Sequence, residues 1–205
     1  MPLPDALVAT LALTGVLDEL AVPYLVAGSL ASSYHGIPRS TANADLVAAL
    51  SVEHAAPLVS RLTAAFYIDL DRVRDAIQRR SSFNAIHLAT MVKVDVFILK
   101  DTPLGRQEME RRQPMRLLGL PETVLHVATA EDTVVQKLAW YRLGGQVSEH
   151  QWKDVLGIIK VRRQDLDLAY LRRSRAGDLR FAGPSLGRKH LGVGPPPNRR
   201  RGSSA

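Results

Sequence analysis

The stretch from Tyr24 to Leu50 reads YLVAGSLASSYHGIPRSTANADLVAAL and contains the features on which the predicted fold depends. Residues 24–27 are four apolar residues, typical of a short buried strand, and Gly28-Ser29 ends that strand with a turn. A helix is expected over 30–34, with the serine of the turn as its N-cap. Residues 45–50 predict a second strand. This order of strand, small-residue turn, helix and strand sets the frame for the rest of the chain.

A third strand is expected over 91–99, where the sequence reads MVKVDVFIL. Both of its faces are largely apolar, as in a central strand that is covered on both sides. Asp95 is the exception, because an acid is costly to bury without a partner. Lys93 lies two residues earlier and on the same face, so a partly buried ion pair is one explanation. A role for Asp95 as a metal ligand is the other.

The polar residues of these strands predict a metal site. Asn43 and Asp45 are two residues apart, so on a strand that begins by residue 43 both point to the same side. Asp95 on that face of a neighbouring strand would add a third oxygen ligand. Magnesium prefers oxygen ligands and shares phosphate oxygens of its substrate, and two such ions can bridge the attacking and leaving oxygens of a displacement. Asn43 is the weak ligand of this predicted site, because its amide brings no negative charge where a carboxylate would.

The turn at Gly28-Ser29 predicts the other half of the site. Glycine lets the backbone approach a ligand closely, and free N–H groups at the start of the following helix favour an anion such as a triphosphate. Arg39 lies just before the metal strand, where its guanidinium can take phosphate charge.

Each of these pieces also has an ordinary structural explanation. Gly-Ser turns between a strand and a helix are common, and Asn-x-Asp at the start of a strand is most often turn chemistry. Asp69 and Asp71 form a second D-x-D pair without a preceding Gly-Ser turn. We interpret that pair as turn and helix-cap chemistry, although it is the main rival for the metal. The three pieces together are more specific than any one alone.

Composition limits the function classes. The chain has 205 residues, 46% of them hydrophobic, which is enough for one domain or a domain with an appendage. It has no cysteine, which excludes disulfides and thiolate metal sites and is consistent with a cytoplasmic protein. No run of 18 apolar residues occurs, so no membrane span is expected.

The net charge of +7 belongs to the C-terminal end of the chain. Residues 171–205 contain nine Arg or Lys and one Asp, which leaves 18 basic and 19 acidic residues in the first 170. The body of the protein is therefore near neutral, and its overall basicity is no argument that the fold binds nucleic acid.

The pattern along the chain predicts an α+β fold, with a small mixed sheet flanked by helices. We expect a core domain over 1–128, a helical C-terminal region over 129–173, and a disordered basic tail over 174–205, which is rich in Pro, Arg and Gly. Further helices are expected at 5–21, 52–65, 72–79, 103–112, 131–142, 148–160 and 165–173, a strand at 66–70 and another at 83–90, and mixed strand and loop at 115–128.

The order and spacing of the three pieces resemble the polymerase-β-like nucleotidyltransferase superfamily. The pattern of that superfamily is a strand, a G-[GS] turn, a D-x-D strand and a third acid on a later strand. This chain has Gly28-Ser29, Asn43-Ala44-Asp45 and Asp95 in those places. The closest resemblance is to the AbiEii-like group, which includes the toxins of type IV toxin–antitoxin systems.

Further motifs support this resemblance, which covers about 5–170. Arg39 and Thr41 are in register with the R-x-T-x-D-x-D neighbourhood of the AbiEii-like group. Two later segments, EDTVVQKL at 131–138 and QWKDV at 151–155, resemble its helical motifs. In those motifs a Lys faces the nucleotide and an Asp follows in the next helix, which indicates Lys137 and Asp154 here.

The resemblance implies that a nucleoside monophosphate is transferred from a nucleoside triphosphate to an RNA, such as tRNA, or to a small molecule, with release of pyrophosphate. It implies Mg²⁺ or Mn²⁺ as cofactor and an antitoxin as partner. The residues implied are Asp45 and Asp95 as metal ligands and catalytic residues, Asn43 as a weakened ligand, Gly28, Ser29, Arg39, Thr41 and Lys137 for the nucleotide, and Asp154 in support. The ordinary alternatives are a surface position for Lys137 and an i, i+4 or capping interaction for Asp154.

Three interpretations remain open. The first is a magnesium-dependent nucleotidyltransferase that is weakened because Asn43 leaves two carboxylates where the superfamily has three. The second is a catalytically degenerate module with the same fold, which binds a nucleotide or a partner. The third and weakest is RNA binding through the arginines at 199–201 of the tail.

Overall fold

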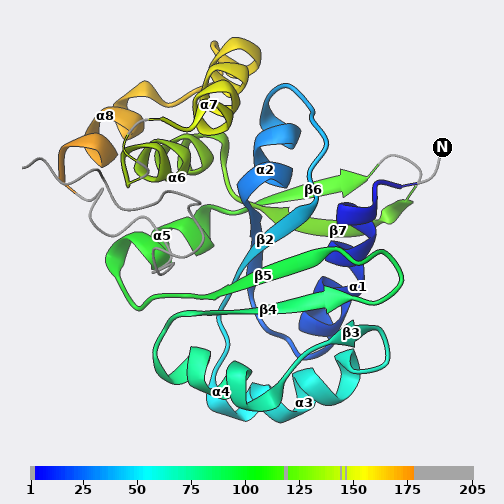
Figure 1. Cartoon of the computed structure of the whole chain (residues 1–205). Helices are drawn as coiled ribbons and strands as arrows, with labels where there is room; N and C mark the ends of the chain where they lie inside the picture. The colour runs from blue at the N-terminus through cyan, green and yellow to red at the C-terminus, as the bar shows by residue number, and fades with distance from the viewer. Residues whose placement is uncertain (1–2, 118–119, 144, 146, 178–205) are drawn as a thin grey trace, which may run out of the picture.

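The computed structural model describes residues 3–117, 120–143, 145 and 147–177. The described chain forms an α+β fold around one seven-stranded mixed sheet, in the order β3-β4-β5-β2-β1-β7-β6 (Figure 1). Its strands are β1 Tyr24–Ala27, β2 Asn43–Ala48, β3 Phe66–Tyr67, β4 Ser82–His87, β5 Lys93–Ile98, β6 Gln113–Leu117 and β7 Leu120–Val127.

Helices gather in two places around this sheet. They are α1 Asp5–Glu19, α2 Gly28–His35, α3 Val52–Leu62, α4 Leu70–Gln78, α5 Pro103–Arg111, α6 Ala130–Leu143, α7 Glu149–Arg162 and α8 Leu168–Gly177. Helix α3 packs against both α1 and α4, and α1 and α4 also contact the sheet, whereas α2 packs with α6 and α7, and α8 packs on α6 (Figure 1). None of the helices in the described ranges is long and apolar enough to cross a bilayer.

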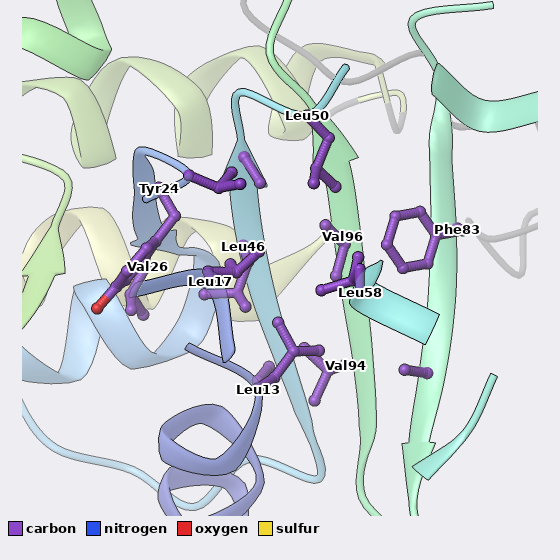
Figure 2. Close-up of a cluster of buried hydrophobic side chains, with 14 of the residues drawn as sticks. Leu13, Leu17, Tyr24, Val26, Leu46, Leu50, Leu58, Phe83, Val94 and Val96 are labelled. Atoms are coloured by element: carbon purple, nitrogen blue, oxygen red, sulfur yellow. The ribbon is translucent and has the colours of Figure 1, made fainter. Parts of the chain in front are cut away.

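The main hydrophobic cluster lies on one face of the central strands, and a smaller one that includes Leu25 lies on the other. Leu46 of β2 and Val94 and Val96 of β5 are fully buried in the main cluster, together with Leu13 of α1 and Leu58 of α3 (Figure 2). Because side chains alternate along a strand, the residues between them project to the opposite face. The apolar alternation of β2 and β5 therefore determines which residues are left for a site.

The observed elements confirm the predicted fold class and correct several predicted boundaries. β2 begins at Asn43, two residues earlier than predicted. Helix α2 begins at Gly28, and Ala27 is its N-cap, so the prediction that Ser29 caps this helix is wrong. The strand predicted at 66–70 is only two residues long, because Asp69 already caps α4 and accepts a hydrogen bond from the backbone N–H of Arg72.

The structure also differs from the prediction at the end of the core domain and at the start of the predicted tail. Residues 113–117 and 120–127 are two antiparallel strands, where a mixture of strand and loop is expected from the sequence. Helix α8 continues through Gly177, so residues 174–177 of the predicted tail are helical. The remainder of the predicted tail, 178–205, lies outside the described residues.

Glu108 of α5 lies next to a group of polar side chains around Asp132 of α6. Its neighbour Asp132 accepts hydrogen bonds from the hydroxyls of Thr129 (2.6 Å) and Tyr170 (2.5 Å). Burial first, and then the negative charge of Asp132, raise the pKa of Glu108 to about 8. The Oε1 atom of Glu108 is buried and has no hydrogen-bond partner among the described residues. Glu108 is therefore protonated in the folded protein at neutral pH.

This pKa predicts a pH dependence of stability. In the unfolded chain the Glu108 carboxyl ionises near 4.5, and in the folded protein it ionises at about 8. Between these values only the unfolded state loses the proton, so the free energy of unfolding falls as pH rises, by at most about 1.4 kcal/mol per pH unit. In Glu108→Gln the free energy of unfolding should not fall in this way. Measured by chemical denaturation, the variant should therefore become more stable relative to the wild type as pH rises from about 5 to about 8. Glu110→Gln, at an exposed neighbouring position, is the control, and an equal gain for Glu108→Gln at both pH values would contradict the assignment.

Candidate active site

Asp45 and Asp95 are direct neighbours on two adjacent strands. β2 and β5 are parallel, and their register pairs Asp45 with Asp95 and Asn43 with Lys93. Paired residues of adjacent strands project to the same face of a sheet, and this face lies opposite the buried Leu46 and its neighbours. One geometric condition of the predicted site, carboxylates 45 and 95 on one face, is met.

Gly28 lies directly against Asp45. The antiparallel pairing of β1 with β2 places Ala27 opposite Asp45, and Gly28 follows with a φ of +60°. A Cβ on Gly28 would lie 1.9 Å from Oδ2 of Asp45, so no side chain fits at this position. The carboxylate therefore occupies the space that the glycine leaves open, and the turn and the predicted metal strand form one site.

The charges around Asp45 indicate a site for a cation. Burial raises the pKa of the Asp45 carboxyl, and the negative charge of Asp95 raises it further. Lys137, Lys93 and the backbone of Ser29 act in the opposite direction without cancelling this increase. The two carboxylates lie side by side, and burial disfavours the charged form of Asp45. Their oxygens fit a hard divalent cation such as Mg²⁺.

Lys93 pairs with one of the two carboxylates. Its Nζ lies 2.7 Å from Oδ2 of Asp95. The ion pair that was the alternative explanation for Asp95 is therefore present, and it lies beside Asp45 rather than in a separate part of the sheet. Asp95 is thus paired with Lys93 and also lies beside Asp45 in the predicted metal site.

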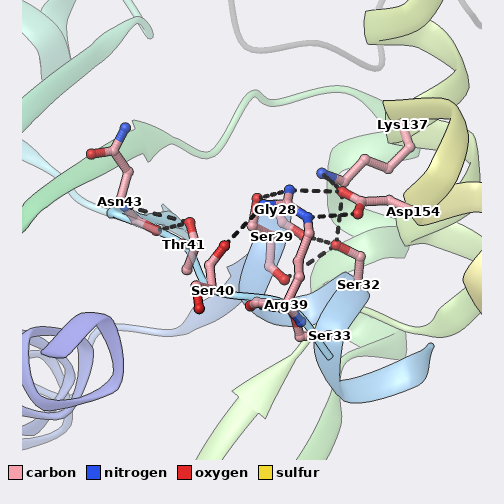
Figure 3. A network of polar contacts seen from close by, with 10 residues as sticks. All are labelled: Gly28, Ser29, Ser32, Ser33, Arg39, Ser40, Thr41, Asn43, Lys137 and Asp154. Atoms are coloured by element: carbon pink, nitrogen blue, oxygen red, sulfur yellow. Dashed lines mark hydrogen bonds and ion pairs between the residues drawn. The ribbon is translucent and has the colours of Figure 1, made fainter. Parts of the chain in front are cut away.

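Asn43 and Thr41 form the entry to β2. The Thr41 hydroxyl donates a hydrogen bond to the backbone carbonyl of Asn43 (2.9 Å), and the Asn43 side chain is exposed. Figure 3 shows the Asn43 amide directed away from the group formed by Arg39, Lys137 and Asp154. Asn43 shares the face of Asp45 because the two are two residues apart on β2.

A second polar group, on the other side of the turn, is centred on Asp154 of α7 (Figure 3). Its Oδ1 accepts from Nε of Arg39 (2.8 Å), and its Oδ2 lies 3.0 Å from a terminal nitrogen of Arg39 and 2.7 Å from Nζ of Lys137. The Ser32 hydroxyl also donates to Oδ2 (3.2 Å). These contacts join α7, α6, α2 and the loop before β2.

Burial and long-range contacts contradict the ordinary explanations for Lys137, a surface position, and for Asp154, a local or capping interaction. The Lys137 side chain is 6% exposed and that of Asp154 is 5% exposed, so Lys137 is no surface lysine. Asp154 contacts residues far away in the sequence, so it is no i, i+4 or capping residue. Burial alone would raise the pKa of Asp154, but the hydrogen bonds from Arg39 and Lys137 outweigh it and lower the pKa. Asp154 is therefore ionised and holds both cations in place.

Arg39 connects this group to the turn. Its terminal nitrogen donates to the Ser29 hydroxyl at 2.6 Å, and its side chain is 34% exposed. Lys137 acts on the Asp45 carboxyl electrostatically. The turn at Gly28-Ser29 thus has two carboxylates on one side and two cations on the other, an arrangement suited to a cation and a phosphate side by side.

Two residues of the site were not found from the sequence. Asn84 of β4 pairs with Asp95 and is exposed, so the row Ala27, Asp45, Asp95 and Asn84 crosses four strands. The period-2 alternation of residues 82–87 could have placed Asn84 on this face. No sequence signal indicated Ser32, whose hydroxyl reaches Asp154 on a distant helix.

The rival pair Asp69 and Asp71 has the role expected of it. Asp69 caps α4, and the side chain of Asp71 is 92% exposed and pairs with Arg74. In the part of the chain that the structure describes, no group of three or more His, Cys, Asp or Glu is placed to hold a metal ion. Neither the predicted metal site nor the Asp69–Asp71 pair therefore offers three carboxylates.

An apolar hollow of about 450 Å³ lies elsewhere, between α6, α7 and α8, and is lined by residues such as Leu138, Trp152 and Leu171. None of the predicted site residues lines it. Its chemistry differs from that of the turn, and we do not include it in the candidate site.

The contact between Gly28 and Asp45 predicts that Gly28→Ala is harmful. The new Cβ would strain the backbone at positive φ and push against the carboxylate, with an expected loss of about 2–3 kcal/mol in the free energy of unfolding. Gly145→Ala is the matched control, because Gly145 has a φ of +73° and a Cβ added there would meet no atom within 4 Å. It should lose only the strain energy, about 1 kcal/mol. Equal losses in urea denaturation would show that Asp45 does not impose the glycine.

The buried position of Asp154 predicts a large effect of Asp154→Asn. The change leaves Lys137 buried without an ionised partner and weakens the contact with Arg39, with an expected loss of about 3–5 kcal/mol. Glu149→Gln on the same helix is the control, because it breaks an exposed ion pair with Lys153 and should cost less than about 1 kcal/mol. Thermal or chemical denaturation of both variants tests the difference, and similar losses would contradict a role of Asp154 in holding the cations.

No protein-family model matches the sequence, and no curated protein matches it either. Solved structures do match. An antigenic nucleotidyltransferase-like protein from Paracoccidioides brasiliensis is similar with a TM-score of 0.53 and 15% identity, over 89% of this chain and 94% of that chain. The antibiotic-resistance factor ANT(2'')-Ia is similar with a TM-score of 0.51 and 16% identity, over 84% of this chain and 91% of its own. The described chain has the nucleotidyltransferase fold, as predicted, and these similarities do not single out the AbiEii-like group.

Proposed function

We propose that this protein is a nucleotidyltransferase that uses Mg²⁺ or Mn²⁺ to move a nucleoside monophosphate from a nucleoside triphosphate to a hydroxyl group, with release of pyrophosphate. The observation that carries the proposal is the pairing of Asp45 with Asp95 beside the Gly28-Ser29 turn. The nucleotidyltransferase fold of the described chain supports it.

The metal would be held by Asp45 and Asp95, whose oxygens lie on one face of the sheet. A bound divalent ion supplies positive charge to the phosphate oxygens and to the leaving pyrophosphate. Asp95 is also placed to accept the proton of the attacking hydroxyl, because its carboxylate is partly exposed at 17%. Asn43 is a weak ligand in this proposal, since its amide brings no charge.

The triphosphate would lie against the turn. The backbone of Ser29 and its hydroxyl are on the turn, and Arg39 already contacts that hydroxyl. Arg39 and Lys137 supply two positive charges to phosphate oxygens. Thr41 has a supporting role, because its hydroxyl holds the backbone of Asn43 at the start of the metal strand. Asp154 orients both cations.

The acceptor falls into one of two classes. The resemblance to the AbiEii-like group favours tRNA or another RNA, and with it an antitoxin partner. The similarity to an antibiotic-resistance factor favours a small molecule. Residues 1–170 are near neutral and offer no excess of basic charge for RNA, so the small-molecule class needs testing beside RNA.

A second candidate function follows from Asn43. Two carboxylates, one of them paired with Lys93, bind metal more weakly than three, and weak metal binding favours nucleotide binding without transfer. In this form the protein is a degenerate enzyme that senses a nucleotide or binds a partner.

A transfer assay with α-labelled nucleoside triphosphates distinguishes the two. The wild type, Asn43→Asp and Asp95→Asn are incubated with Mg²⁺ and either total RNA or a panel of hydroxyl-bearing antibiotics. We expect label on one acceptor class with the wild type, at least about ten-fold more with Asn43→Asp, which corresponds to ~1.4 kcal/mol of barrier, and none with Asp95→Asn.

The outcomes separate the functions. Metal-dependent binding of the triphosphate without transfer by the wild type, and transfer restored in Asn43→Asp, would favour the degenerate module. Binding that does not depend on metal would contradict the metal-dependent transferase, and no binding would contradict both the transferase and a nucleotide sensor. A circular dichroism melt of each variant shows that the proteins are folded.

A further inference from the structure

Lys93 lies in the row of residues next to the two carboxylates. In the strand register it lies opposite Asn43 of β2 on one side and opposite Ile86 of β4 on the other. Its Nζ reaches along its own strand to Oδ2 of Asp95, 2.7 Å away. The ammonium group is thus on the face of Asp45 and Asp95, at the end of the site where Asn43 replaces a carboxylate.

The charges at this end of the site differ from those of a three-carboxylate site. Asp45, Asp95, Asn43 and Lys93 together carry a net charge of −1 when the acids are ionised. Three carboxylates without a lysine would carry −3. One divalent ion already makes the observed group positive, whereas two divalent ions are needed to do so with three carboxylates. A second divalent ion at this group would be repelled both by Lys93 and by the first ion.

Resting on the proposed function, we infer that the Lys93 ammonium takes the place of one of the two divalent ions, and that the site binds a single Mg²⁺ or Mn²⁺ per chain at Asp45 and Asp95. The single ion belongs to the end of the site beside Gly28, where the Asp45 carboxylate lies against the turn and Lys93 is paired with Asp95 instead. Lys93 is a positioning residue in this arrangement, since it holds the Asp95 carboxylate.

The alternative is that Lys93 is a structural ion pair that opens when metal binds. In that case the number of bound ions depends on Asn43 alone, and Lys93 has no effect on it. The two explanations differ in the number of ions that Asn43→Asp binds while Lys93 is present. If Lys93 takes the place of an ion, the number stays at one, and if Lys93 is only a structural ion pair, it rises to two.

The test is a titration of the full chain with Mn²⁺ alone, in which free Mn²⁺ is counted by electron paramagnetic resonance. We expect one ion for the wild type and one for Asn43→Asp. The double variant Asn43→Asp/Lys93→Met should bind two, and Asn43→Asp/Lys93→Arg, which keeps the charge, should bind one. Lys93→Met alone should bind one ion about ten-fold more tightly, because a positive charge beside Asp95 is lost.

Controls keep the outcomes clear. Lys153→Met removes an exposed lysine from an ion pair on α7 and should bind Mn²⁺ as the wild type does. Asn43→Asp/Lys93→Gln replaces the methionine variant if circular dichroism shows that the latter is unfolded. Two ions in the wild type or in Asn43→Asp alone, or one ion in every double variant, would overturn the inference and leave the proposed function standing. No Mn²⁺ binding by any folded variant would overturn both.

Discussion

The parallel register of β2 against β5 is the constraint from which the site follows. A shift of one residue would turn every side chain of β5 to the other face. Asp95 would then enter the core in place of Val94 or Val96, which are fully buried against α1 and α3. Burying an unpaired carboxylate costs several kcal/mol, so the packing of these valines against Leu46 enforces the pairing of Asp45 with Asp95. Hydrophobic packing on one face thus positions the charges on the other.

The same pairing is unfavourable in electrostatic terms. Burial and the charge of Asp95 both oppose ionisation of Asp45. Two lysines lie nearby, but Lys93 is paired with Asp95, and Lys137 is held by Asp154. An arrangement that serves folding alone would separate the two acids or bury them less. Residues whose environment opposes their charge are typical of functional sites, because a bound ligand supplies what the protein lacks.

Local periodicity was sufficient to predict the central strands near residues 45 and 95, because alternation in a strand is a property of neighbouring residues. That residues 45 and 95 share a face required the register of β2 against β5. The local pattern failed at Ser29, since α2 begins at Gly28, two residues earlier than a cap at 29 requires. The group around Asp154 depends on contacts such as Arg39 with Asp154, 115 residues apart, which no local pattern encodes. The resemblance indicated Lys137 and Asp154, but their mutual ion pair and burial required the folded chain.

Asp154 also shapes what nucleotide binding would require. In the proposed function, a phosphate at the turn would interact with Arg39 and Lys137, which are already paired with the ionised Asp154. Their positive charge is therefore shared between Asp154 and the phosphate, which weakens the attraction compared with two free cations. The same sharing fixes their side chains before the ligand arrives, so little side-chain entropy is lost on binding. In the proposed reaction, which releases pyrophosphate, moderate attraction with fixed geometry is more useful than strong attraction, because a tightly held product would slow turnover.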